Sequence, residues 1–209
     1  MKSKLLLLAI VVCAAALMPQ SAPLAQTGSN QIGIYTTPDA NPDNVNYNGA
    51  PGSFTAYCVI TNPRNYHYGD PNSTEERTIT RIGGFEFKLV VPAGVFILAQ
   101  TLPPLTANFH PDPQNFFCGT NLPVVDGAAV CVTLSIGAFS GAPAQLFVAP
   151  VNTVPTFPGH MAITDYDDDF RENIAYPASG SFDAPVFGLW STVVPTEDAS
   201  WGELKTLFR

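Results

Sequence analysis

The chain has 209 residues, of which 12% are charged and 11% aromatic, and its formal net charge at neutral pH is −8. This acidic balance repels nucleic acid and anionic membrane surfaces, so we expect neither as a partner. The length suits one domain with a sizeable core, and the composition is too apolar for a mostly disordered chain.

The first 25 residues have the pattern of a secretory signal peptide. Lys2 and Lys4 form a charged start, an apolar run follows, and small residues and prolines complete the segment. The run is too short for a stable bilayer span and no comparable run follows it, so we expect no transmembrane span in the mature protein. The predicted location is secreted, extracellular or cell-surface, or periplasmic if the protein is retained.

Residues 26–192 are predicted to form one all-β domain. Short β-like runs alternate with clusters of Pro, Gly, Asn and Asp. The predicted strands are residues 31–37, 53–63, 81–92, 94–102, 129–139, 145–151, 160–166 and 184–190. Their number and spacing favour a two-sheet antiparallel β-sandwich of Ig-like or jelly-roll-like type.

The clearest strand lies within residues 81–92. Phe85, Phe87 and Leu89 alternate with Glu86 and Lys88, so the three apolar side chains are expected to face the core. In contrast, residues 37–52 and 102–121 are rich in turn formers and are predicted to be long loops. Loops of this length are uncommon unless they bind a ligand or cover a sheet.

An aromatic turn suggests a ligand site. Tyr66, His67 and Tyr68 follow one another beside Asn and Asp residues, and exposed tyrosines in such a setting can stack on a sugar ring. Trp190, at the end of the last predicted strand, is a candidate for the same role. The alternative is that one tyrosine closes the edge of the sandwich and the other lies on its surface.

Three cysteines follow the predicted signal peptide. Val130 and Val132 alternate with Cys131, which places Cys131 on the outer face of its strand, where Cys118 of the preceding loop could reach it. We therefore predict a Cys118–Cys131 disulfide, which would stabilise the fold by about 3 kcal/mol. A Cys58–Cys131 bridge between sheets is the alternative.

An acidic run follows the strand at residues 160–166. Alternating carboxylates at Asp165, Asp167 and Asp169 could present oxygen ligands to Ca²⁺. The twelve-residue calcium loop does not fit, because Phe170 and Tyr176 stand where it needs a glycine and a glutamate. A solvated acidic turn is therefore the competing interpretation, and no other cofactor is expected.

The chain lacks the sequence signature of a known catalytic centre. His67, His110 and His160 are widely separated, and no G-x-S-x-G motif occurs. A pair of carboxylates that meets only in the folded chain is compatible with any such sequence. The protein is accordingly predicted not to be an enzyme, with an exported hydrolase as the alternative.

Residues 193–209 are predicted to form a linker and a short amphipathic helix. Ser200 and Glu203 have capping-box spacing at its start. The apolar face that would dock on a surface comprises Trp201, Leu204, Leu207 and Phe208. So short a helix needs burial to persist, either on its own domain or on a partner that reads it as a tag.

The motifs at residues 32–35, 83–96, 116–124 and 176–188, together with the closing SWGELKTLFR, resemble uncharacterised exported bacterial β-sandwich proteins that end in a similar tail. This resemblance covers most of the mature chain and implies no activity or catalytic residue. A weaker similarity, limited to strand order, is to cohesin-like and other adhesion sandwiches.

These observations favour a secreted or cell-surface protein of structural, adhesion or interaction type that acts through a protein partner. A carbohydrate-binding module that contacts a surface glycan, with Ca²⁺ as a possible aid, is the second hypothesis. An exported hydrolase is the third.

Overall fold

The computed structural model describes residues 28–191 and residue 193, and this part of the chain is built almost entirely of strands. The long strands are β1 (Gln31–Tyr35), β3 (Gly52–Thr61), β6 (Arg81–Val90), β7 (Val95–Thr101), β9 (Asn115–Pro123), β10 (Ala128–Ala138), β11 (Ala144–Ala149), β12 (Met161–Asp165) and β13 (Arg171–Pro177). The short elements are η1 (Pro42–Asn44), β2 (Asn46–Tyr47), β4 (Arg64–Asn65), β5 (Arg77–Thr78), β8 (Ala107–Asn108) and β14 (Phe187–Leu189).

The predicted signal peptide and, apart from residue 193, the predicted tail lie outside the described residues. The same holds for the proposed docking side chains of that tail, Trp201, Leu204, Leu207 and Phe208. Within the described part, no helix has the length and apolar character needed to cross a membrane.

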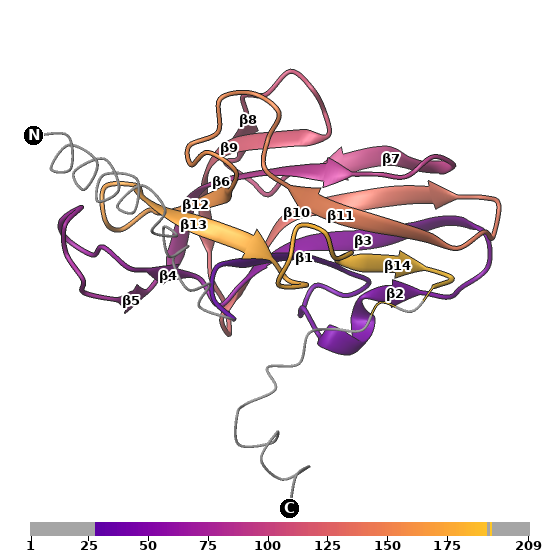
Figure 1. Ribbon diagram of the computed structural model, residues 1–209, viewed down its shortest axis with the longest axis horizontal. Helices are drawn as coiled ribbons and strands as arrows, with labels where there is room; N and C mark the ends of the chain where they lie inside the picture. Colours follow the sequence, from indigo (N-terminus) through magenta and orange to yellow (C-terminus); the bar gives the residue numbers. More distant parts are fainter. Residues whose placement is uncertain (1–27, 192, 194–209) are drawn as a thin grey trace, which may run out of the picture.

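Most strands belong to one mixed sheet. A 12-stranded sheet runs in the order β2-β14-β11-β6-β12-β13-β1-β3-β10-β7, with β9 on β6 and β8 on β9, while β4 and β5 pair separately (Figure 1). The prediction of an all-β protein is confirmed. The sheet is mixed because β1 runs parallel to β13 and β2 runs parallel to β14, which differs from the wholly antiparallel arrangement expected.

β6 lies at the centre of the sheet, since β9 pairs along one of its edges and β11 and β12 follow one another along the other. Phe85, Phe87 and Leu89 are at most 2% exposed, which confirms the predicted inner face. Phe87 stacks on Phe116 of β9 at 4.8 Å between ring centroids. The largest core cluster joins these residues to Leu134 of β10 and to side chains of β1 and β3.

The predicted Cys118–Cys131 disulfide is wrong, because Cys58, Cys118 and Cys131 are all free and buried. The reason is a shift of register between Val130 and Val132, which lets Cys131 point inward together with Val132. Cys131 is fully buried, and its thiol donates to the Cys58 carbonyl oxygen at 3.2 Å. The Cys58–Cys131 alternative is likewise not formed.

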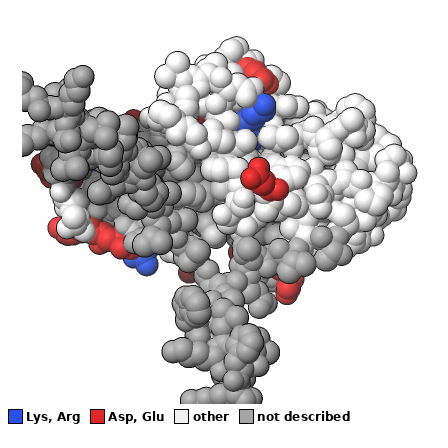
Figure 2. All heavy atoms as spheres, in the orientation of Figure 1, with Lys and Arg blue, Asp and Glu red and all other residues white. Residues whose placement is uncertain are grey.

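Charged side chains are sparse over much of the described surface. Figure 2 shows one face on which neutral residues cover most of the described area and acidic and basic groups stand in small separate clusters. A ligand of this face would therefore meet mainly uncharged groups.

Candidate functional site

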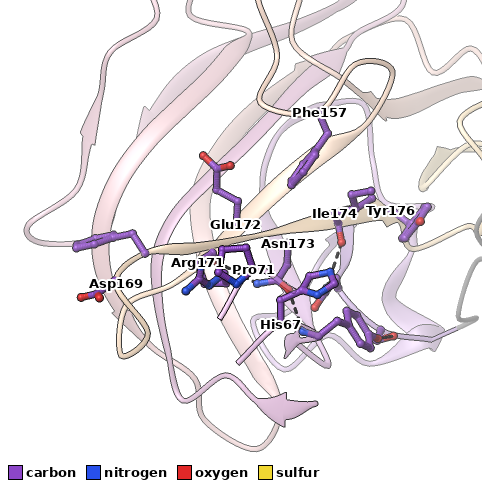
Figure 3. A pocket seen from close by; sticks show the side chains of 13 residues that line it. His67, Pro71, Phe157, Asp169, Arg171, Glu172, Asn173, Ile174 and Tyr176 are labelled. Carbon is purple, nitrogen blue, oxygen red and sulfur yellow. Dashed lines mark hydrogen bonds between the residues drawn. The ribbon is translucent and has the colours of Figure 1, made fainter. Parts of the chain in front are cut away.

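A pocket lies along β13 and faces the loop that follows β4. Its volume is about 780 Å³, within the range typical of small-ligand sites. Tyr66 and His67 line it from the loop, Glu172 and Tyr176 from β13, and Phe157 from the segment before β12. In Figure 3, Tyr176 stands at the opposite end of the labelled group from Asp169, and Phe157 lies across β13 from His67.

The pocket forms where one side of β13 lacks a strand neighbour. β12 pairs with β13 from Arg171 to Ala175, whereas β1 pairs with it only at Tyr176 and Pro177. Asparagine side chains replace the missing strand: Asn30 Nδ2 donates to the Ile174 carbonyl oxygen at 3.1 Å, and Tyr66 N donates to Asn173 Oδ1 at 3.0 Å. These hydrogen bonds hold the backbone of β13 in place and leave the pocket open.

Asn65 fixes the loop that carries Tyr66 and His67. It is fully buried, and its Nδ2 donates to Asp165 Oδ2 at 3.0 Å and to Asp168 Oδ2 at 2.9 Å. Its Oδ1 accepts a hydrogen bond from His67 N at 3.0 Å. One amide therefore ties the aromatic turn to the acidic turn between β12 and β13.

Asp168 provides the second anchor of this loop. Its Oδ2 also accepts from Gly69 N at 3.0 Å and from Arg171 Nε at 3.4 Å. Burial alone would raise the pKa of Asp168, but the hydrogen bonds from Asn65, Gly69 and Arg171 outweigh it and hold this pKa below its usual value. Asp168 is therefore ionised, and bound to the loop, at neutral pH.

The aspartates predicted as calcium ligands have separate partners. Asp165 is 3% exposed, and its two oxygens accept from Asn65 Nδ2 and from Asp167 N. Asp167 pairs with Arg81, whereas Asp169 lines the pocket. The described residues hold no group of three or more His, Cys, Asp or Glu side chains placed to bind a metal ion. Asp165 and Asp167 already accept from protein donors, and the Ca²⁺ site at these residues stays a prediction.

The structure brings together half of the predicted ligand-binding residues. Tyr66 and His67 line the pocket, and His67 Nδ1 donates to the Ser73 carbonyl oxygen at 2.8 Å, which leaves Nε2 as the acceptor of the neutral ring. Tyr68 lies outside the lining, with the Arg77 guanidinium 3.7 Å from its ring centroid. Trp190 is also elsewhere, since its Nε1 donates to the Gly49 carbonyl oxygen at 2.8 Å.

Sequence reasoning missed the aromatic residues on the opposite wall. Tyr176 lines the pocket, and its ring lies edge-to-face with the His160 ring at 5.9 Å between ring centroids. Burial raises the pKa of Tyr176, and the neighbouring Tyr66 adds to the effect, so its hydroxyl is a proton donor at neutral pH. Its strand was overlooked because the inward positions of β13 include Asn173 and Ala175, which give only a weak apolar alternation.

Comparison of this chain with protein-family models, with curated proteins and with solved structures finds no match. Its class therefore follows from its own geometry: an all-β protein with an open pocket formed between a strand and an anchored loop. The pocket combines aromatic rings with imidazole, carboxylate and phenol groups, a set suited to a polar, ring-shaped ligand.

Proposed function

We propose that this protein is a secreted or cell-surface binding protein of the interaction or adhesion type, without enzymatic activity, and that its ligand is a surface glycan. The observation that carries the proposal is the convergence of Tyr66, Tyr176 and Phe157 with His67 and Glu172 around one pocket. The three aromatic residues reach the pocket from three separate segments, and the loop segment is fixed by buried hydrogen bonds.

The chemistry of the lining matches that of a sugar. The C–H face of a pyranose packs on an aromatic ring, which Tyr66, Tyr176 or Phe157 supplies. Sugar hydroxyls need both donors and acceptors, and Tyr176 offers a protonated phenol while His67 Nε2 and the Glu172 carboxylate accept. The pocket volume of about 780 Å³ leaves room for more than one ring orientation.

The exposed state of the pocket carboxylates supports a non-enzymatic role. Asp169 and Glu172 are both exposed to solvent. Glycoside hydrolysis needs one carboxyl group that is kept protonated, usually by an apolar environment. Asp169 and Glu172 are exposed and are not enclosed in this way.

We infer in addition that the single mixed sheet curls into a sandwich-like arrangement. In support, buried residues of β3 and β10 belong to the same core cluster as those of β6 and β9. Stacked sheet layers of this kind bury one face and leave the other for binding.

A second candidate function is contact with a protein partner through β7. This strand ends the main sheet path, and Phe96 and Leu98 on it are 54% and 52% exposed, near Phe139, which is 59% exposed. Exposed apolar side chains on an edge strand favour association with another chain. This second function would be contradicted if the native mass stays that of a monomer at every concentration and cross-linking from β7 captures no partner.

The experiment that tests the proposed function is a printed array of neutral and acidic glycans probed with the full exported protein. Binding to a defined group of glycans is the expected result. The variant Asn173→Leu removes the acceptor for Tyr66 N. It should lose this binding because the loop that carries Tyr66 is no longer held against the pocket wall. Failure of the wild-type protein to bind any glycan on the array would contradict the proposal.

A further inference from the structure

A second hollow, of about 250 Å³, lies on the outer face of the sheet next to the first pocket. Its floor follows the strand register across four strands. Gly119 of β9 pairs with Gly84 of β6, Gly84 pairs with Thr164 of β12, and Thr164 pairs with Glu172 of β13. All four residues line the hollow, so it crosses the strands instead of following one of them.

Close packing requires glycine in the floor of this hollow. A Cβ atom at Gly84 would stand 2.8 Å from the Cys118 carbonyl oxygen and 3.2 Å from Thr164 Oγ1. The position therefore holds no side chain without a shift of the backbone. Glycine is therefore required at this point of the floor, where the backbone of β9 and the Thr164 hydroxyl lie against it.

Three exposed aromatic side chains surround this floor. Phe109, Phe117 and Phe170 are 68%, 47% and 51% exposed, and all three line the hollow. Phe109 lies over Gly119, at 3.3 Å from the position of a Cβ there, and Phe170 lies over Gly83. Large apolar rings gathered at one exposed hollow indicate a binding surface more than a folding requirement.

The hydroxyl of Thr164 supplies a polar group at the same place. Its Oγ1 is buried and has no hydrogen-bond partner among the described residues. Buried polar atoms in native proteins are nearly always paired, so an orphaned hydroxyl beside a glycine floor suggests that a ligand pairs with it.

The two hollows are contiguous, because Phe170 and Glu172 line both of them. We propose that the glycine-floored hollow is a second subsite, which binds the neighbouring unit of a glycan whose first unit occupies the pocket at Tyr66 and Tyr176. This inference rests on the proposed function and deepens it. The ligand class becomes an oligosaccharide that lies across β9, β6, β12 and β13.

The test measures affinity against glycan length. The probes are cello-oligosaccharides and chito-oligosaccharides of one to six units, together with the glycans that the array retains. The variants are Thr164→Val, which removes only the orphaned hydroxyl, and Phe109→Ala, which removes an exposed wall. Phe139→Ala is the matched control, since Phe139 is 59% exposed and lines neither hollow.

For the wild type and Phe139→Ala, affinity should rise from one unit to longer glycans. Phe109→Ala should lose about fivefold in affinity for the longer glycans and leave one-unit binding unchanged. Thr164→Val should also lower the affinity for the longer glycans. Its urea unfolding midpoint should stay equal to that of the wild type or rise, because an unpaired polar group is removed.

The outcomes separate the two claims. The second subsite is overturned if affinity depends on Tyr66 but does not rise with glycan length. It is also overturned if affinity is insensitive to both Thr164→Val and Phe109→Ala. Either result leaves the proposed function intact. An absence of wild-type binding to every probe overturns both.

Discussion

Replacement of Asn65 by alanine should destabilise the protein strongly. The change removes the donors to Asp165 Oδ2 and Asp168 Oδ2 and the acceptor for His67 N. Hydrogen bonds to charged groups contribute roughly 1.5–3 kcal/mol each. Because Asp165 is only 3% exposed, water replaces its lost donor poorly. The two bonds to carboxylates together give an expected loss of about 3 kcal/mol or more in the free energy of unfolding.

Urea unfolding followed by circular dichroism measures this loss. The matched control is Asp167→Asn in the same acidic run, whose partner is Arg81. Both side chains of this pair are more than a third exposed, at 35% and 44%, so the expected loss is below about 1 kcal/mol. The reasoning is refuted if Asn65→Ala costs no more than Asp167→Asn.

Three further predictions concern acid stability, thiol reactivity and the core. The pKa of Asp168 is lower in the folded than in the unfolded chain. The contribution of Asp168 to the free energy of unfolding is therefore present above pH ~4 and is lost as pH falls through the folded pKa. Urea midpoints at pH ~6 and ~3 should accordingly differ less in Asp168→Asn than in the wild type. Burial raises the pKa of Cys118 to about 12 and also raises the pKa values of Cys58 and Cys131. Iodoacetamide should therefore label these thiols only after unfolding. An intact mass that shows two of them oxidised to a disulfide would contradict this prediction. Phe87→Ala, at a fully buried position, should cost about 3–5 kcal/mol in urea unfolding, and a loss below about 1 kcal/mol would be inconsistent with the described core.

Strands with regular apolar alternation could be predicted from the sequence. The predicted ranges 53–63 and 81–92 match β3 and β6 closely, because alternate side chains of these strands belong to the core. The alternation in β3 includes Cys58, which is fully buried. In these strands local pattern and tertiary packing agree.

β9 and β13 could not be predicted in the same way. β9 includes Asn115 and Thr120 at buried positions, and β13 includes Asn173, so polar side chains interrupt the apolar pattern. The Asn115 side chain is hydrogen-bonded, because its Nδ2 donates to Asp112 Oδ2 at 2.7 Å. Such bonds arise from tertiary contacts and leave no periodic signal in the chain.

The site was only partly predictable for a related reason. Tyr66 and His67 are adjacent in sequence, and their composition alone suggested a ligand. Tyr176 and Phe157 lie about a hundred residues later along the chain, and the bond from Asn65 to Asp168 helps to hold the loop of Tyr66 beside them. The acidic run was recognised, but its role as an anchor depends on partners that the sequence does not reveal.

The most direct test of the central claim compares Tyr66→Ala with Tyr68→Ala in calorimetric titration with a glycan retained on the array. The two tyrosines are two positions apart, but only Tyr66 lines the pocket. We predict that Tyr66→Ala weakens binding at least about fivefold and that Tyr68→Ala leaves it unchanged. Equal effects of the two substitutions, or none from either, would contradict a glycan site in this pocket.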